Sequence, residues 1–133
     1  MSRKSKGSII PNGVAIWSHE MAVAQILANA GHTVEFIPVN NAETNSNNPD
    51  ILMDNKIWEI KSPKTDKLSG IERNLKRASH QSAHIILHSG RIKRLHNDSI
   101  QSFLIKKFRQ QKNIESLLYI DRHHKIIDIS RLV

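Results

Sequence analysis

The stretch of sequence that decides the fold is PDILMDNKIWEIK, residues 49–61. Its two short apolar runs flank a few polar residues, a pattern that predicts two strands joined by a tight turn. A two-residue turn fits at Asp54-Asn55 or, one residue later, at Asn55-Lys56, and the sequence leaves both registers open. The choice matters because the register decides which charged residues face one another across the hairpin.

The charged residues of this hairpin carry the chemistry. Asp50 pairs with Glu59 in the first register and with Lys61 in the second. Glu59 and Lys61 share a face in both registers, because side chains alternate along a strand. Two carboxylates and one ammonium are therefore expected at one end of a small sheet. That combination suits a divalent cation beside a base or a charge stabiliser, which is the equipment for cutting phosphodiesters.

The composition points to the same class of substrate. The chain has 133 residues, which suits one domain, and its 20 Lys and Arg against 12 Asp and Glu give a net charge of +8. An excess of this size favours a polyanionic partner such as nucleic acid. The absence of cysteine excludes disulfides and thiolate metal sites. No apolar stretch is long enough to cross a bilayer, so we expect no membrane partner and no signal peptide within the chain.

The rest of the chain predicts a single domain of alternating helices and strands. Residues 1–16 are largely polar and basic, and they predict a flexible arm or linker before a domain at 17–133. Apolar residues recurring every three to four positions predict helices at 17–30, 69–81 and 99–111. Short apolar runs predict further strands at 33–39, 83–88, 117–120 and 125–129, and residues 40–48 predict a loop. This order predicts an α/β fold in which a mixed central sheet is flanked by helices.

The motif of the hairpin resembles a known one. Pro49-Asp50 followed by Glu59-Ile60-Lys61 resembles the PD-(D/E)xK motif of a large nuclease superfamily. More narrowly, roughly residues 17–129 resemble the C-terminal tRNase domain of contact-dependent growth-inhibition toxins of the CdiA type. The segments that carry this likeness are Ser18-His19-Glu20, Pro49-Asp50, Trp58-Glu59-Ile60-Lys61-Ser62-Pro63, Leu75-Lys76-Arg77-Ala78 and Gln81.

The resemblance implies a role for each acidic residue. Asp50 and Glu59 would hold Mg²⁺, Mn²⁺ or another divalent cation, and Lys61 would act on the attacking water or the phosphate. Glu20, on the preceding helix, would add a metal ligand or orient the substrate. The alternative for each residue taken alone is ordinary: Asp50 caps a turn, and Glu59 and Lys61 are solvated on an exposed strand face.

The helix after the motif supplies the expected phosphate-binding residues. Arg73, Arg77 and Gln81 are spaced four apart, so they fall along one side of that helix. The resemblance implies that they face the phosphate of the substrate, whereas a plain solvated helix face is the alternative.

The function implied by the resemblance is a metal-dependent endoribonuclease that cleaves tRNA in the cytoplasm of a target bacterium. Such a domain would arrive as the tail of a larger secreted protein, and a cognate immunity protein would block it. A metal-dependent DNA endonuclease and a non-catalytic nucleic-acid-binding module are the alternatives. A metal-free ribonuclease with two histidines is the rival chemistry, with His80 as its best candidate. Trp17 and Trp58 are expected in the core.

Overall fold

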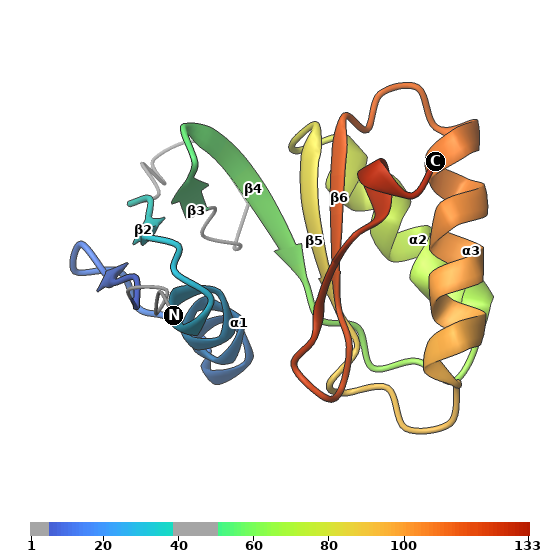
Figure 1. Ribbon diagram of the computed structural model, residues 1–133, viewed down its shortest axis with the longest axis horizontal. Helices are drawn as coiled ribbons and strands as arrows, with labels where there is room; N and C mark the ends of the chain where they lie inside the picture. Colours follow the sequence, from blue (N-terminus) through green and yellow to red (C-terminus); the bar gives the residue numbers. More distant parts are fainter. Residues whose placement is uncertain (1–5, 39–50) are drawn as a thin grey trace, which may run out of the picture. The chain divides into compact units, whose positions relative to one another are not determined.

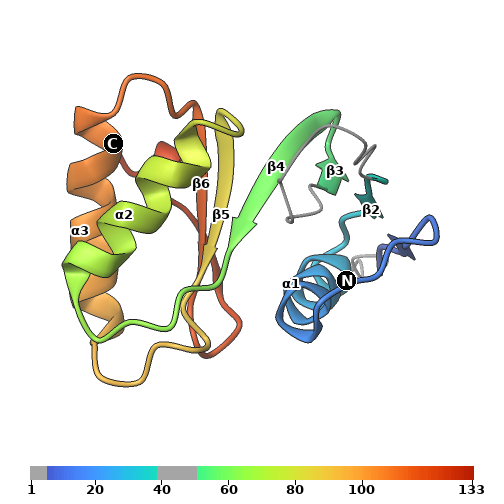
Figure 2. The same cartoon turned by 180° about the vertical axis from the view of Figure 1, so that it is seen from behind.

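The computed structural model describes residues 6–38 and 51–133, and Figures 1 and 2 show its elements from opposite sides. Within these ranges the chain forms seven strands, three α-helices and one short 3₁₀-helix, and the strands follow one another in chain order from β1 to β7. Parallel and antiparallel pairs both occur, so the predicted mixed α/β fold is confirmed. The chain divides into two compact units, Met1–Trp58 and Glu59–Val133, which are described in turn.

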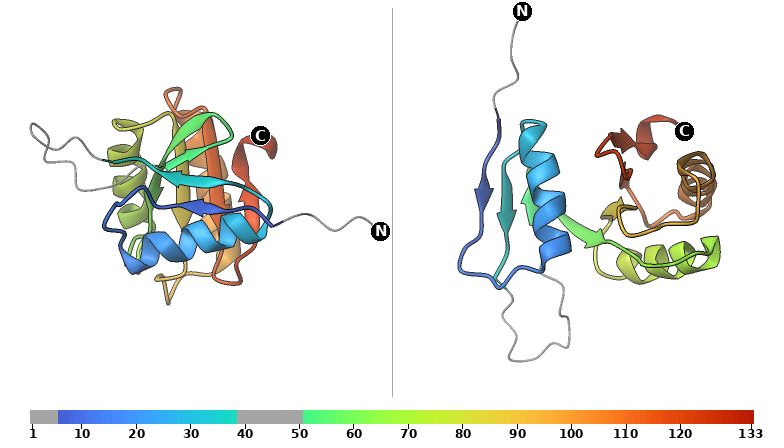
Figure 3. Two further views of the ribbon diagram at one scale, coloured as in Figure 1. Left: turned by 90° about the vertical axis from the view of Figure 1, so that its left-hand side faces the viewer. Right: turned by 90° about the horizontal axis from the view of Figure 1, so that it is seen from below.

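The first unit holds one helix and the first strands. β1 (Ile9–Ile10) pairs in parallel with β2 (Val34–Phe36), and β2 pairs antiparallel with β3 (Ile51–Met53). Helix α1 (Ser18–Asn29) lies alongside β1 and β2 (Figure 3). Its buried residues are Glu20, Val23, Ala24, Ile26, Leu27 and Ala28, and the helix ends before Gly31, whose positive φ of 103° suits a residue without a side chain.

The hairpin settles the register that the sequence leaves open. β3 pairs antiparallel with β4 (Lys56–Lys61), with Ile51 opposite Trp58 and Met53 opposite Lys56. The turn is therefore Asp54-Asn55, and both residues have positive φ, at 55° and 63°, as the two-residue type I′ turn requires. This is the first of the two registers. Asp50 and the predicted loop at 40–48 lie outside the described residues.

The segment before α1 is ordered from Gly7 to Asn12, where the sequence predicts no strand. The Gly7 N–H donates to the Ala28 carbonyl at 2.8 Å, and β1 adds to the edge of β2. The Asn12 side chain donates to the Phe36 carbonyl at 2.9 Å. Two isoleucines are too short a run for periodicity to indicate a strand, and only the pairing with β2 defines it.

The second unit packs two helices against one face of a small sheet. β5 (His84–His88) and β6 (Ser116–Ile120) are parallel over five residue pairs, and β7 (Ile126–Asp128) pairs antiparallel with β6 before a 3₁₀-helix, η1 (Ile129–Arg131). Helices α2 (Leu68–Ser79) and α3 (Asn97–Gln110) lie side by side against β5 and β6 (Figures 1 and 2). Because α3 connects two parallel strands, it crosses over the sheet, as such connections do.

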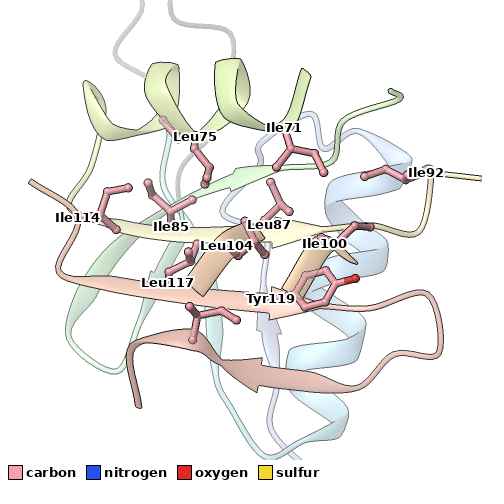
Figure 4. Close-up of a cluster of buried hydrophobic side chains, with 12 residues drawn as sticks. Ile71, Leu75, Ile85, Leu87, Ile92, Ile100, Leu104, Ile114, Leu117 and Tyr119 are labelled. Atoms are coloured by element: carbon pink, nitrogen blue, oxygen red, sulfur yellow. The ribbon is translucent and has the colours of Figure 1, made fainter. Parts of the chain in front are cut away.

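The core of this unit lies between those helices and strands (Figure 4). The fully or almost fully buried residues of this core include Ile71 and Leu75 from α2, Ile85 and Leu87 from β5, Ile100 and Leu104 from α3, and Leu117 and Tyr119 from β6. All of them are at most 1% exposed. Across the described residues, no helix combines the length and apolar character that crossing a membrane requires.

Candidate active site

Glu59 and Lys61 form an ion pair at the end of β4. The Lys61 Nζ lies 3.2 Å from Glu59 Oε2, and the two side chains are 12% and 1% exposed. β4 begins exposed at Lys56 and Ile57 and becomes buried from Trp58 onward, so the motif sits where the strand enters the interior. The alternative of two solvated residues on an open strand face is therefore wrong.

The burial of this pair has an energetic meaning. Charged side chains are almost never fully buried unless they are paired, and even a paired set contributes little net stability, because desolvation offsets most of the attraction. Apolar residues of similar size would hold the end of β4 at least as well. Stability alone therefore does not account for a buried carboxylate beside a lysine at this position.

Glu20 is also buried, at 2% exposure, in the first turn of α1. That position suits a carboxylate, because the first backbone N–H groups of a helix carry a partial positive charge. Glu20 belongs to the first unit, whereas Glu59 and Lys61 belong to the second. The structure thus brings Glu59 and Lys61 together, and the participation of Glu20 and Asp50 in the same site stays a prediction.

Two of the three predicted phosphate-binding residues lie on α2. Arg73 and Arg77 are exposed and one helical turn apart, as expected. Gln81 is not on the helix, because α2 ends at its C-cap, His80. The Gln81 N–H donates to the Ala78 carbonyl at 2.8 Å, which closes the helix with a turn three residues long. The prediction of a helix reaching Gln81 is therefore wrong.

The predicted metal set is Asp50 with Glu59. Over residues 6–38 and 51–133, no three His, Asp or Glu side chains gather as a metal-ligand group, and Asp50 lies outside these ranges. Glu59 itself fits the role, since it is a buried carboxylate with hard oxygens next to a cation that can share its charge. The bound metal therefore stays a prediction.

A second group of polar residues in this unit was not predicted from the sequence. His96, Asn97 and Asp98 at the start of α3, with Arg122 and His123 after β6, line a cavity of about 460 Å³. The parallel pairing of β5 and β6 joins these segments, and no local pattern in the sequence indicates that. The Arg122 guanidinium donates to the Leu95 carbonyl, which ties the two loops together.

A hydrogen-bond network next to this cavity includes Asn97, one of its lining residues. The Tyr119 hydroxyl donates to Asn97 Oδ1 at 3.0 Å and lies 3.1 Å from Ser89 Oγ. Burial raises the pKa of Tyr119, and the nearby Asp121 adds to that effect, while the Ser89 hydrogen bond opposes it. Burial thus favours the neutral form of Tyr119 by raising its pKa.

The two tryptophans differ in their surroundings. Trp58 is buried as predicted, and its Nε1 donates to the Met53 carbonyl at 3.0 Å. The prediction for Trp17 is wrong, because its side chain is 60% exposed and stacks on His19 with ring centroids 6.2 Å apart. Trp17 is the N-cap of α1, so it precedes the buried stripe of that helix.

Comparison with protein families gives a match over residues 47–126 to the contact-dependent growth inhibition CdiA C-terminal domain. This range is 80 of the 133 residues and contains Asp50, Glu59 and Lys61. Among solved structures, a CdiA-CT/CdiI toxin and immunity complex from Burkholderia pseudomallei contains a similar chain. The TM-score is 0.67 at 17% identity, over 92% of this chain and 98% of that one, so the likeness is one of fold. A search of the curated proteins found no match.

Proposed function

Because the chain belongs to the contact-dependent growth inhibition CdiA C-terminal domain family, we propose that it is a growth-inhibition toxin that acts as a metal-dependent nuclease. The observation that carries the nuclease assignment is the Glu59–Lys61 ion pair, buried at the end of β4 inside the matched range. The order Pro49-Asp50, Glu59, Lys61 has the form of the PD-(D/E)xK motif.

In this proposal the acidic residues and the lysine have different roles. Glu59, with Asp50, would hold Mg²⁺ or Mn²⁺, which when bound supplies an acidified water and neutralises charge on the phosphate. Lys61 places a compact positive charge beside the reacting phosphate or the attacking water. Its 12% exposure keeps most solvent away, and charges act more strongly where water is excluded. Glu20 would orient the substrate or add a metal ligand.

We propose RNA, and tRNA in particular, as the substrate. The net charge of +8 and the exposed Arg73 and Arg77 suit a phosphate backbone, whose contacts dominate affinity for nucleic acid. The preference for tRNA over DNA comes from the resemblance of the whole ordered set to tRNase domains. DNA cleavage by the same metal site is the alternative that experiment must separate.

Two further parts of the proposal concern biology. A cognate immunity protein would bind and block the toxin, as the toxin and immunity complex with the same fold suggests, and an acidic surface on that partner would complement this basic chain. The domain would be the tail of a larger secreted protein and would act in the cytoplasm of the target bacterium.

A second candidate chemistry has one specific observation in its favour. His96 and His123 line the same cavity with Arg122. Two imidazoles can act as general base and general acid without a metal, and a guanidinium can hold the phosphate between them. This would be the metal-free histidine ribonuclease, with residues other than His80.

The test is cleavage of total tRNA and, separately, of plasmid DNA, each with Mg²⁺ and with EDTA. Glu59→Gln should abolish cleavage, and the matched control Glu115→Gln, on a side chain 71% exposed, should not. Discrete tRNA fragments that require both metal and Glu59, beside intact plasmid, would support the proposal. Nicked plasmid would move the assignment to a DNA endonuclease. Full activity in EDTA that disappears in His123→Ala would replace the metal mechanism with the histidine one.

A further inference from the structure

A second cavity of the second unit lies directly after the Glu59–Lys61 pair in the chain. Its volume is about 480 Å³, within the range of about 300–1,000 Å³ in which proteins bind small ligands. One wall follows β4 and the other follows β5. The lining residues are Lys64, Thr65, Asp66, Gly90, Arg91 and Lys93.

The charge of the lining favours an anion. Three cations, Lys64, Arg91 and Lys93, stand against the one carboxylate of Asp66, so the lining carries a net charge of +2. The Asp66 Oδ2 lies 3.9 Å from Arg94 Nε, a cation that is not part of the lining and that offsets the single negative charge. An ammonium–guanidinium set of this kind suits phosphate oxygens.

The walls of the cavity are held in place by the fold. Thr65 Oγ1 accepts from the Lys67 N–H at 3.1 Å and donates to the Lys67 carbonyl at 3.2 Å, which fixes the loop as a tight turn. Gly70, in the first turn of α2, leaves the room for Thr65, since a Cβ there would lie 2.2 Å from the Thr65 hydroxyl. A loop fixed in this way loses little conformational freedom when a ligand binds.

The opposite wall begins at a residue with no side chain. Gly90 is exposed, and a Cβ at this position would meet the His88 ring at 2.7 Å. A glycine here therefore leaves room for the buried His88 ring next to the exposed backbone of the cavity lining. Arg91, the next residue, is half-buried, so its guanidinium is better positioned than that of a fully solvated arginine.

The distance along the chain connects this cavity to the ion pair. Lys64 follows Lys61 by three residues, and three residues span at most about 11 Å of backbone. A nucleic-acid strand advances about 3.4 Å per nucleotide along its axis, so this reach covers a few nucleotides. We propose that the cavity binds a backbone phosphate of the nucleic-acid substrate, a few nucleotides from the bond cut beside Lys61. This rests on the proposed nuclease function and specifies how the same site holds its substrate.

The experiment measures binding apart from cleavage. The affinity for labelled tRNA is measured in EDTA at several salt concentrations for the Glu59→Gln protein. The same measurement is made on a Glu59→Gln protein that also carries Lys64→Ala and Arg91→Ala. Because both side chains are proposed to contact the same phosphate, their joint loss should lower the slope of log affinity against log salt by about 0.7–0.9 and weaken binding at least tenfold at low salt. The control pair Arg109→Ala with Lys112→Ala removes the same charge elsewhere in the unit and should lower the slope by less than half as much.

Each outcome decides something. An unchanged slope of log affinity against log salt in the cavity double variant would mean that the cavity contributes nothing to binding. An equal loss of slope in the control double variant would mean that the cavity contributes only net charge. Either result would overturn the proposal. Lys64→Glu, at an exposed position that packing does not constrain, should weaken binding further than Lys64→Ala if the contact is electrostatic. Unchanged tRNA affinity with lost affinity for the immunity protein would assign the cavity to that partner instead. If the protein binds tRNA with the expected salt dependence but never cleaves it, the phosphate-binding proposal holds and the nuclease proposal fails.

Discussion

A double-mutant cycle on Glu59 and Lys61 tests the idea that this buried pair is kept for chemistry. Lys61→Met removes the ammonium that lies 3.2 Å from a carboxylate only 1% exposed. Removing one partner of a buried pair costs about 3–5 kcal/mol, and Lys61 at 12% exposure places this change at about 3. Glu59→Gln keeps the shape and leaves an ammonium that water can still reach, so we expect a cost of about 1–2 kcal/mol.

The double variant, Glu59→Gln with Lys61→Met, removes both charges and should cost only about 2 kcal/mol. The single costs sum to more than that, which gives a coupling free energy of about 2–3 kcal/mol between the two side chains. Urea unfolding of the four proteins measures each free energy of unfolding. All three variants should also fail to cleave tRNA, although the double variant should be about 1 kcal/mol more stable than Lys61→Met.

Two results would contradict a coupled, catalytic Glu59–Lys61 pair. Additive costs, within about 0.5 kcal/mol, would mean that the two side chains do not interact in solution. Cleavage that persists in Lys61→Met would mean that the pair is structural and that the chemistry lies elsewhere. Glu115→Gln is the control for the substitution itself, and its side chain, 71% exposed, should change stability by less than about 0.5 kcal/mol.

Four further predictions follow from described contacts. Burial raises the pKa of Tyr119, the single tyrosine, so the midpoint of its ultraviolet titration should lie above the ordinary value of about 10. The stability that this shift contributes is present below the ordinary pKa and is lost as the pH rises through the folded pKa, and an ordinary midpoint would contradict the burial. Lys107 lowers the pKa of Glu72 by its hydrogen bond and its charge, so this pair should stabilise the fold above the ordinary carboxyl pKa and lose that effect as the pH falls. In Lys107→Met, the pKa of Glu72 measured by NMR titration should rise, and an unchanged pKa would show that the contact is absent in solution. Asn55 has a φ of 63°, so Asn55→Ala should cost about 1 kcal/mol in urea unfolding, whereas Asn55→Gly should cost less; the reverse order would exclude the type I′ turn. Leu104 is fully buried, so Leu104→Ala should cost about 2–5 kcal/mol, and a cost below 1 would place α3 away from the core.

The elements with strong periodicity were predictable from the sequence. The stripes of α2 and α3 and the apolar run of β5 gave their positions to within two residues, because burial selects apolar side chains at those spacings. The hairpin was predictable to within one residue, and the structure then chose the Asp54-Asn55 turn. The charged pair could be found because side chains two apart on a strand share a face.

Three features that the sequence did not reveal depend on contacts distant in sequence. β1 exists because β2 offers it an edge, and nothing in Ile9-Ile10 alone indicates a strand. The His96 and His123 cavity forms only once β5 and β6 are paired in parallel. The burial of Glu59 was likewise not predictable, since alternation gives the face of a strand residue but not whether that face is covered.

The positions of the tryptophans and the tyrosine allow the unfolding of the two units to be followed separately without any added label. Trp17 and Trp58 both belong to Met1–Trp58, whereas the single tyrosine, Tyr119, belongs to Glu59–Val133. Since Trp17 is already 60% exposed, a red shift of tryptophan emission on unfolding would come mainly from Trp58. Emission therefore follows the first unit and tyrosine absorbance the second. Coincident midpoints in one urea titration would make the chain a single cooperative block, and separated midpoints would make it two, each with its own stability.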